Sequence, residues 1–412
     1  MSLGQLQAPG ETFGFAQGEL LVGQVPVRQL AERVGQTPFY AYDRDAISGR
    51  VAEWRSVMPD RLALHFAIKA NPMPALVAHM AGLVDGFDVA SAGELRVALD
   101  AGMAPARISF AGPGKTDTEL RAAVAAGITV HLESAGELAR IAEIGATLGI
   151  CPRVAVRVNP DFELKSAGMK MSGGPKPFGV DAEAVPEMLG RIRTLGLGFR
   201  GFHIYTGSQN LRPEAICQAH TQTLLLAQRL AESAPGPVAY LNIGGGLGIP
   251  YFPGERRLDL APIAANLAAG LADLPEHFHD TELIMELGRY LVGEAGVYIC
   301  RVIDRKVSRG RTYLVTDGGL HHHLAASGNF GQVVRKNYPV LVAARQASDA
   351  ATEEVTVVGP LCTPLDILAE RLVLPVCAPG DLIAVLQSGA YGYTASPLAF
   401  LSHPPPAQVL VG

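Results

Sequence analysis

LALHFAIKA, residues Leu62–Ala70, is an apolar run that ends in a lysine, and seven comparable apolar runs follow it along the chain. These runs are typical of buried strands, and the alanine-rich amphipathic stretches between them are typical of helices. The expected strands are Leu62–Ala70, Gly86–Ser91, Arg107–Gly112, Ile128–Ser134, Arg153–Pro160, Phe199–Gly207, Ala239–Gly246 and Glu282–Gly288. The expected helices are Ala92–Ala101, Thr118–Ala126, Gly136–Leu148, Pro213–Ser233 and Leu260–Leu274. Eight strand–helix units over about 230 residues favour an α/β fold of the (β/α)8 TIM-barrel type, and an open α/β sheet is the alternative.

The pattern changes after residue 290, where strand-like runs follow one another without helices between them. Turns separate these runs, which indicates a second, all-β domain of sandwich or barrel-like form. Its expected strands are Val297–Lys306, Arg311–Thr316, Glu354–Val358, Arg371–Pro375 and Asp381–Gln387. We therefore expect an N-terminal segment (1–40) that joins the β-domain, a barrel (41–290) and a C-terminal β-domain (291–412). Three prolines at 404–406 make the C-terminus a poor continuation of any regular element.

Composition narrows the functional classes. The chain has 412 residues, of which 48% are hydrophobic and 18% charged, which is enough apolar material for two cores. A net charge of −5 without a prominent basic run argues against a nucleic-acid partner. The N-terminus shows no basic region followed by an apolar stretch, and no apolar run is long enough to span a membrane, so we expect neither a secretory signal nor a membrane span. The cysteines, which lack C-x-x-C pairs, indicate reduced thiols in a cytoplasm; they are Cys151, Cys217, Cys300, Cys362 and Cys377.

Reactive side chains stand at the ends of several expected strands, where a barrel builds its site. Lys69 ends the first strand. A lysine there fits either a side chain that reaches out to water or an amine that forms a Schiff base in a partly desolvated pocket. Three glycines, Gly244, Gly245 and Gly246, end the seventh strand, and their N–H groups fit either a plain turn or an anion site.

The eighth and sixth strands add charge and a flat ring. Glu286 and Arg289 fit either a surface ion pair or a carboxylate for a cationic ring nitrogen beside an arginine for a phosphate. His203 is followed by Thr206-Gly207-Ser208, so it is either a core histidine or a stacking partner for a flat cofactor. Together these groups point to a flat, cationic, phosphorylated aldehyde, which describes pyridoxal 5′-phosphate (PLP).

Six blocks in the same order resemble the fold-type III PLP-dependent decarboxylases, the group of diaminopimelate, ornithine and biosynthetic arginine decarboxylases. The resemblance runs from Thr37-Pro38 to Tyr391. The blocks are FAIKANP (66–72), GFDVASAGEL (86–95), NIGGGLG (242–248), ELGR (286–289), GPLCTPLD (359–366) and GAY (389–391).

This resemblance implies a role for each matching residue. Lys69 would carry the cofactor with Asp88 near it, His203 would stack on the ring, and Glu286 would pair with the ring nitrogen. Cys362 would reach the site from the partner subunit of a homodimer and protonate the carbon that CO2 leaves. The phosphate would be held by Gly244–Gly246, Arg289, Tyr391 and a hydroxyl, either that of Thr206 or that of Ser208.

Three features depart from the pattern of free diamino-acid decarboxylases. The strand-six block is spaced differently, which leaves Thr206 and Ser208 open as phosphate ligands. Thr363 stands where relatives place an acid, and residues 316–338 offer His321, His322, His323, Arg335 and Lys336 rather than a substrate-binding carboxylate. This segment is similar to the butirosin-type decarboxylase of carrier-bound glutamate and to exosortase-associated relatives. Three consecutive histidines suggest metal binding only weakly, because neighbours on a strand point to opposite faces, so we expect no metal site.

The leading hypothesis is α-decarboxylation of an amino acid, either free or as an aminoacyl carrier protein. The alternatives are a decarboxylase of free diaminopimelate or another diamino acid, and an amino-acid racemase, against which Cys362 and the β-domain blocks argue. A hypothesis of another class is a non-catalytic homologue that regulates a true enzyme. It has little support, because Lys69, Glu286, Arg289 and Cys362 are all present.

Overall fold

The computed structural model describes residues 12–162, 169–170, 173–332, 334–344 and 351–412. By its internal contacts the chain forms two compact units, and each is described by itself. The barrel unit comprises Val51–Gly248 and Leu258–Gly288. The β unit comprises Met1–Arg50, Ile249–Arg257 and Arg289–Gly412.

The barrel unit contains a closed ring of eight parallel strands. Neighbours pair in the order β9-β12-β14-β15-β5-β6-β7-β8, and β8 pairs with β9 to close the ring. This confirms the TIM barrel, and the open-sheet alternative is wrong. The strands are β5 (Leu62–Ala67), β6 (Gly86–Val89), β7 (Ile108–Phe110), β8 (Thr129–Leu132), β9 (Arg153–Asn159), β12 (Gly198–Ile204), β14 (Tyr240–Gly245) and β15 (Glu282–Leu287). Short strands β10 (Met169–Lys170), β11 (Val180–Asp181) and β13 (Gly207–Ser208) lie outside the ring.

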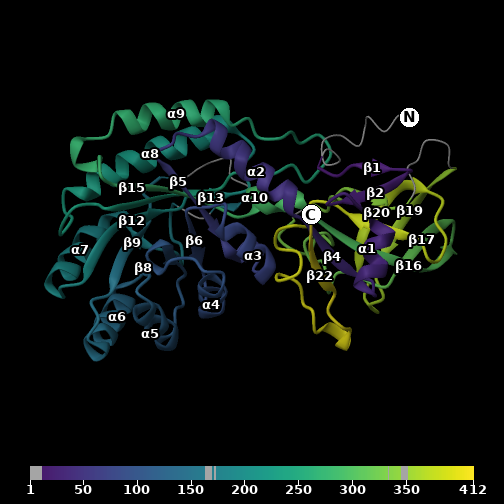
Figure 1. The fold of residues 1–412 in the computed structure, drawn as a ribbon, viewed down its shortest axis with the longest axis horizontal. Coiled ribbons are helices and arrows are strands. Elements are labelled where there is room, and N and C mark those ends of the chain that lie inside the picture. Colours follow the sequence, from purple (N-terminus) through teal and green to yellow (C-terminus); the bar gives the residue numbers. More distant parts are fainter. Residues whose placement is uncertain (1–11, 163–168, 171–172, 333, 345–350) are drawn as a thin grey trace. The chain divides into compact units, whose positions relative to one another are not determined.

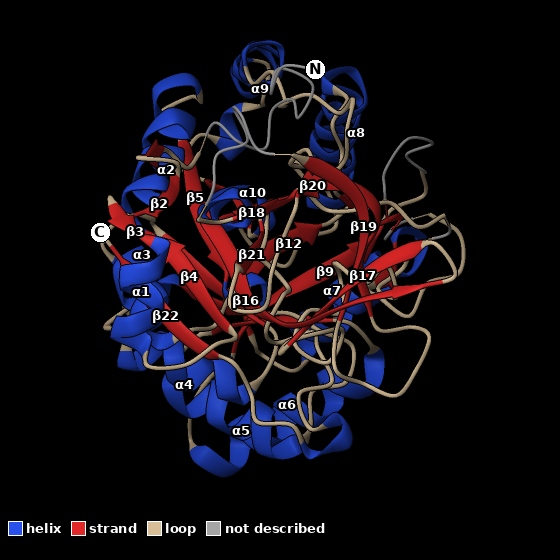
Figure 2. Cartoon of the chain, turned by 90° about the vertical axis from the view of Figure 1, so that its right-hand side faces the viewer, coloured by secondary structure: helices blue, strands red, loops and turns tan. Residues whose placement is uncertain are grey.

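Helices surround the barrel strands (Figures 1 and 2). They are α3 (Pro74–Ala81), α4 (Ala92–Asp100), α5 (Asp117–Ala126), α6 (Ala135–Leu148), α7 (Val185–Thr194), α8 (Pro213–Ala231) and α9 (Ala261–Ala272). Local sequence fixes several ends. Ser91 and Ser134 each accept a hydrogen bond from a backbone N–H in the first turn, and Thr116 forms a capping box with Glu119.

The β unit is built around one eight-stranded sheet. Its main path runs β18-β21-β16-β17-β19-β20, with β4 paired to both β16 and β22. The strands are β4 (Phe39–Asp43), β16 (Gly296–Ser308), β17 (Arg311–Thr316), β18 (Val340–Val342), β19 (Thr352–Val358), β20 (Ile367–Pro375), β21 (Leu382–Val385) and β22 (Ala407–Val411). A small sheet of β1 (Phe15–Ala16), β2 (Glu19–Val22) and β3 (Val25–Pro26) precedes α1 (Val27–Val34). The unit also holds α10 (Arg289–Val292), and α2 (Arg44–Val57) spans both units.

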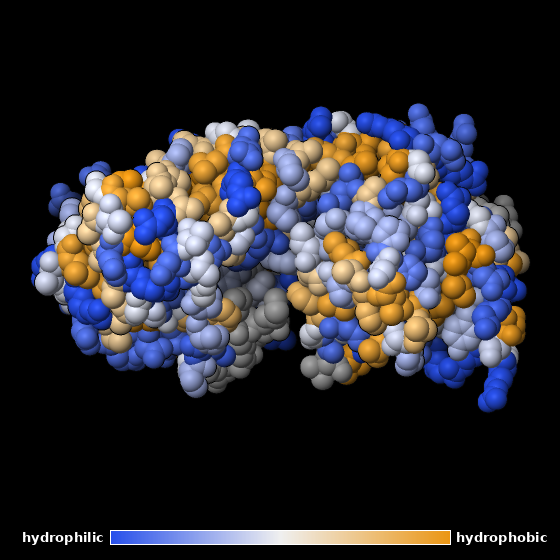
Figure 3. Space-filling view, turned by 90° about the horizontal axis from the view of Figure 1, so that it is seen from below, coloured by the Kyte–Doolittle hydropathy of each residue, from blue (hydrophilic) through white to orange (hydrophobic). Residues whose placement is uncertain are grey.

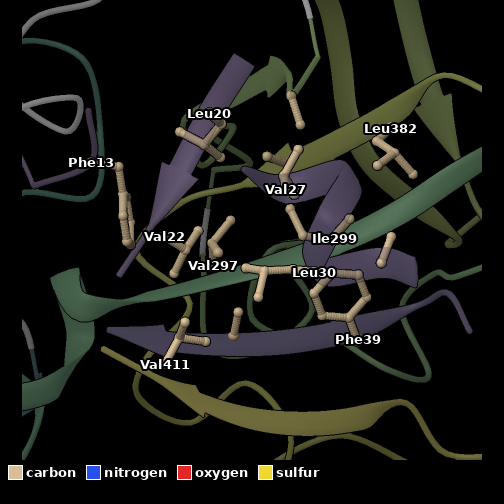
Figure 4. Close-up of a cluster of buried hydrophobic side chains, with 14 of the residues drawn as sticks. Phe13, Leu20, Val22, Val27, Leu30, Phe39, Val297, Ile299, Leu382 and Val411 are labelled. Atoms are coloured by element: carbon tan, nitrogen blue, oxygen red, sulfur yellow. The ribbon is translucent and has the colours of Figure 1, made fainter. Parts of the chain in front are cut away.

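Apolar side chains from both ends of the chain form the core of the β unit (Figure 4). Leu20, Leu30 and Phe39 pack with Ile299 and Val411, and all five are buried. Burying such side chains supplies roughly 1.5–3 kcal/mol each. The N-terminal residues are therefore part of this core.

Two sequence expectations differ from the structure. Strand β22 begins directly after Pro406 and pairs parallel with β4, so the expectation of no regular element at the C-terminus was wrong. Proline ends the preceding segment but places no restriction on the residues that follow it. The expected boundary at residues 40 and 41 falls inside β4, whose partners are both strands of the β unit.

None of the described helices is both long and apolar enough to cross a membrane. On the face shown in Figure 3, hydrophilic residues are interspersed with apolar ones.

Candidate active site

Lys69 lies in a single 3₁₀ turn (Ile68–Ala70) directly after β5. Its side chain is 43% exposed, and its Nζ lies 3.1 Å from the Glu286 carboxylate, whose side chain is 3% exposed. The amine also lies 5.8 Å from the centre of the Tyr205 ring. An accessible amine at the end of a barrel strand can reach the carbonyl carbon of a bound ligand, as a Schiff-base lysine must.

Glu286 is on β15, beside β5, and has a second partner on β12. Nε2 of His203 lies 3.4 Å from its other carboxylate oxygen. Burial alone would raise the pKa of Glu286, but Lys69 and His203 together hold that pKa well below its ordinary value. The structure therefore brings Lys69, His203 and Glu286 together, and the carboxylate stays ionised.

The glycine turn lies so close to neighbouring backbone that a side chain would not fit there. A Cβ on Gly245 would lie 1.9 Å from the backbone oxygen of Glu286, and one on Gly246 would lie 2.3 Å from that of Gly207. Gly244 and Gly246 have φ values of +73° and +89°, which favour glycine. The Thr206–Ser208 segment thus runs beside the turn, and backbone N–H groups can approach an anion closely. The barrel groups fit PLP.

Asp88, expected near Lys69, has partners inside the barrel. Its carboxylate accepts a hydrogen bond from the Ser109 hydroxyl and lies 3.3 Å from Nδ1 of His65. Burial lowers the pKa of His65, but Asp88 outweighs that effect and raises it overall. Asp88 therefore binds Ser109 and His65 inside the barrel, because β6 directs its side chain toward them.

A second buried histidine, His131 on β8, packs against His203. The two ring centres are 4.5 Å apart, and Nε2 of His131 lies 3.0 Å from the Tyr240 hydroxyl. Burial, reinforced by His203, lowers the pKa of His131 well below its ordinary value, so it is neutral. Sequence reasoning missed this layer, because a lone histidine on an apolar strand carries no signal of its own.

Buried ion pairs also fix the loops after β7 and β8. Lys115 donates to Glu137 at 2.6 Å and to the backbone oxygen of His131 at 2.8 Å. Arg157 donates to Glu133 at 2.8 Å, and Glu133 also accepts from Gly179 N–H at 3.0 Å. These pairs hold the carboxyl ends of three strands in one arrangement.

In the β unit, the two side chains expected to bind phosphate lie together. The guanidinium carbon of Arg289 lies 4.7 Å from the centre of the Tyr391 ring, and Nη1 donates to the Tyr251 hydroxyl at 2.8 Å. Tyr251 packs in turn on Tyr338 with ring centres 4.7 Å apart. Tyr251 was not among the expected site residues, because it lies between the NIGGGLG block (242–248) and the ELGR block (286–289).

Cys362 is exposed on the loop between β19 and β20. Thr363 follows it, and its N–H donates to the backbone oxygen of Leu361 at 2.8 Å. The thiol is therefore accessible to solvent.

The three consecutive histidines lie in turns rather than on a strand, and all are at most 1% exposed. Nε2 of His322 lies 2.9 Å from the Pro404 oxygen, and Nε2 of His323 lies 2.9 Å from the Ser388 hydroxyl. Burial lowers the pKa of His321 and His323 to about 3 and that of His322 to about 4. They are neutral packing groups of the β unit, and none faces solvent as a substrate-binding group would.

The described residues contain no group of three or more His, Cys, Asp or Glu side chains that could hold a metal ion. Arg335, which residues 316–338 offer in place of a substrate-binding carboxylate, donates to the backbone oxygens of Ser327 at 2.8 Å and Ile367 at 2.7 Å. It therefore fixes its own loop.

Comparison with known proteins gives consistent results. Residues 44–293 match the family of the pyridoxal-dependent decarboxylases through its pyridoxal-binding domain. The chain is 38% identical over 392 residues to the L-glutamyl-[BtrI acyl-carrier protein] decarboxylase of Niallia circulans, covering 94% of this chain and 91% of the relative. It is 34% identical over 400 residues to the diaminopimelate decarboxylase of Aquifex aeolicus, covering 96% and 91%.

Solved structures show the same likeness. The chain superposes on diaminopimelate decarboxylase (I148L mutant) from Helicobacter pylori, complexed with L-lysine, with a TM-score of 0.83 and 28% identity. The match covers 93% of this chain and 94% of that one. Fold and sequence therefore agree over nearly the whole length.

Proposed function

The chain belongs to the pyridoxal-dependent decarboxylases, and we propose that its substrate is an amino acid with a neutral or anionic far end, carried as a glutamyl-type group on a carrier protein. It is a carboxy-lyase whose cofactor is PLP. When bound, the cofactor accepts the electron pair that the departing CO2 leaves behind.

The residues of the barrel unit would each meet a different part of the cofactor. Lys69 would bind its aldehyde carbon, Glu286 would keep the ring nitrogen protonated, and His203 would stack on the ring. The backbone N–H groups of Gly244–Gly246, with a hydroxyl from Thr206 or Ser208, would bind the phosphate. Arg289 and Tyr391, adjacent in the β unit, would bind it as well.

One observation carries the choice of substrate. Residues 316–338 and 359–366 contain a single acid each, Asp317 and Asp366. Asp317 accepts hydrogen bonds from Arg301 N–H at 2.8 Å and from the Thr37 hydroxyl. Asp366 accepts hydrogen bonds from the N–H of Leu361 at 2.8 Å and the N–H of Leu320 at 2.6 Å. Both carboxylates are therefore engaged within the β unit, and Thr363 replaces the acid that relatives place after the cysteine.

A distal ammonium that meets no carboxylate would lose hydration at a cost of several kcal/mol. A glutamyl group joined to a carrier as a thioester has no such ammonium. The relative from Niallia circulans acts, by its name, on a glutamyl carrier protein, which agrees with these residues. Free diaminopimelate is the second candidate, supported by the Aquifex and Helicobacter relatives.

We infer further that the active form is a homodimer with shared sites, in which Cys362 serves the barrel of the partner subunit. The exposure of Cys362 supports this assignment. The cysteines without C-x-x-C pairs support a reducing, cytoplasmic compartment.

The test is CO2 release from substrates labelled in the α-carboxylate. We expect release from a glutamyl thioester on a carrier protein, and little from free lysine, ornithine or diaminopimelate. A kcat/KM of about 10⁴ M⁻¹s⁻¹ or more for a free diamino acid would refute the substrate assignment. Thr363→Asp is the matched variant, and it should raise activity on diamino acids while lowering it on the thioester.

A further inference from the structure

Asp366 lies at the end of the loop that carries Cys362, and its side chain is buried. Oδ2 accepts the N–H of Leu361 at 2.8 Å, one residue before the cysteine. Oδ1 accepts the N–H of Leu320 at 2.6 Å, in the segment that leads to the three histidines. One carboxylate therefore joins two loops that are far apart in the sequence.

Two glycines make room for this carboxylate. A Cβ on Gly319 would lie 2.2 Å from Oδ1 of Asp366, and one on Gly359 would lie 2.3 Å from Oδ2. Either side chain would displace the carboxylate from its two N–H donors. The two glycines and the aspartate thus form one closely packed, hydrogen-bonded contact.

The loop is also closed on itself. Gly359 N–H donates to the backbone oxygen of Asp366 at 3.1 Å, and Asp366 N–H donates to that of Thr363 at 3.3 Å. Burial raises the pKa of Asp366, and the two backbone donors oppose that rise by stabilising the ionised form. The carboxylate, unlike a carboxamide, can accept with both of its oxygens.

We propose that Asp366 is a positioning residue that holds Cys362 where its thiol delivers a proton to the carbon from which CO2 has departed. The inference rests on the proposed role of Cys362. In that step the S–H bond breaks, a C–H bond forms at the α-carbon, and the thiolate regains a proton from solvent. Asp366 contacts neither substrate nor cofactor in this scheme and acts only through the backbone at Leu361.

The connection extends to the loop of Tyr391. His322 and His323 N–H both donate to the backbone oxygen of Gly319, at 3.0 Å, and the His323 ring meets the Ser388 hydroxyl. Ser388 lies three residues before Tyr391. The Asp366 contact therefore sets the cysteine loop within the same framework that carries a proposed phosphate ligand.

The test uses Asp366→Asn, which keeps the shape but turns one acceptor into an N–H donor facing a backbone N–H. In the full-length holoenzyme, kcat should fall roughly ten- to a hundredfold, because small misplacement of a reacting group has effects of that size. KM and cofactor content should stay unchanged. Alkylation of Cys362 by iodoacetamide should become several-fold faster, with exposed Cys151 as the internal reference.

A double-mutant cycle separates positioning from general structural damage. In a Cys362→Ala background, Asp366→Asn should cause no further loss of kcat. An equal further loss, or an unchanged kcat in the single variant, would overturn the proposal. Normal turnover in Cys362→Ala alone would instead refute the role of the thiol, which is a separate failure.

Two further variants check the result, one that disturbs the same contact and one control. Gly359→Ala disturbs the same contact from its other side and should reproduce both effects if Asp366→Asn folds poorly. Asp381→Asn is the matched control, because that carboxylate also accepts a backbone N–H, from Ala378 at 2.9 Å, in a different turn. Its kcat and its Cys362 alkylation rate should equal those of the wild type, and a change in either would overturn the proposal.

Discussion

Replacing Glu286 by glutamine removes one charge and almost no volume from the centre of the site. In the structure this carboxylate is 3% exposed and lies 3.1 Å from Lys69 and 3.4 Å from His203. A charge-assisted hydrogen bond in such surroundings contributes roughly 1.5–3 kcal/mol. If this stabilisation is lost only in the transition state, kcat decreases about 10- to 150-fold, because each 1.36 kcal/mol changes a rate tenfold.

The assay is steady-state CO2 release with PLP content measured on the same samples. We expect Glu286→Gln to retain the cofactor, because Lys69 and the glycine turn are unchanged, while kcat falls by the stated factor. Glu282→Gln, at the exposed start of the same strand, is the matched control and should keep wild-type kcat. Wild-type turnover in Glu286→Gln would refute the view that this carboxylate governs the ring nitrogen.

Three further predictions follow from the same contacts. Borohydride reduction followed by peptide mapping should place the pyridoxyl group on Lys69, and a label on any other residue would contradict the assignment. Verified heterodimers of Lys69→Ala and Cys362→Ala chains should regain part of the activity, since one hybrid site recovers both groups; no rescue would count against shared sites. Glu133→Gln should lower the free energy of unfolding by about 3–5 kcal/mol in urea titrations, because it leaves Arg157 buried without its ionic partner, and a loss below about 1 kcal/mol would show that the pair is dispensable.

The pH dependence of stability offers one more test. Because Asp88 raises the pKa of His65 in the folded chain despite burial, this pair stabilises the fold most below about pH 6.5 and loses its effect as pH rises through the folded-state pKa. His65→Gln should therefore differ most from wild type at acidic pH. A stability difference that does not vary with pH would contradict the ion pair.

Periodicity was sufficient for the barrel, because each strand is buried on both faces and appears as a continuous apolar run. All eight expected strands overlap strands of the closed ring. The helices α1, α2, α3, α7 and α10 were missed. Three of them, α1, α3 and α10, have at most eight residues, which is too short for a helical period to repeat more than about twice. Strand β4 was also missed, although its pairing with β16 and β22 makes it part of the β unit.

The site was predicted unevenly for the same physical reasons. Lys69 and Glu286 carry a signal because a charge at the end of an apolar strand is costly without a purpose. His131 carries no such signal in the sequence, because its role depends on its contact with His203, which only the folded barrel shows. Asp366 lay inside a quoted block, yet its function as an acceptor for two loops is visible only once Leu320 is folded beside it.

We propose that this chain removes the α-carboxylate of an amino acid with PLP held by Lys69. The most direct measurement is CO2 capture from a glutamyl carrier protein labelled only at the α-carboxyl carbon, with wild type and Lys69→Ala compared at saturating PLP. We expect release of labelled CO2 in proportion to PLP occupancy in the wild type and no release above background in Lys69→Ala. Equal release from both proteins, or CO2 from the wild type that does not depend on PLP, would contradict it.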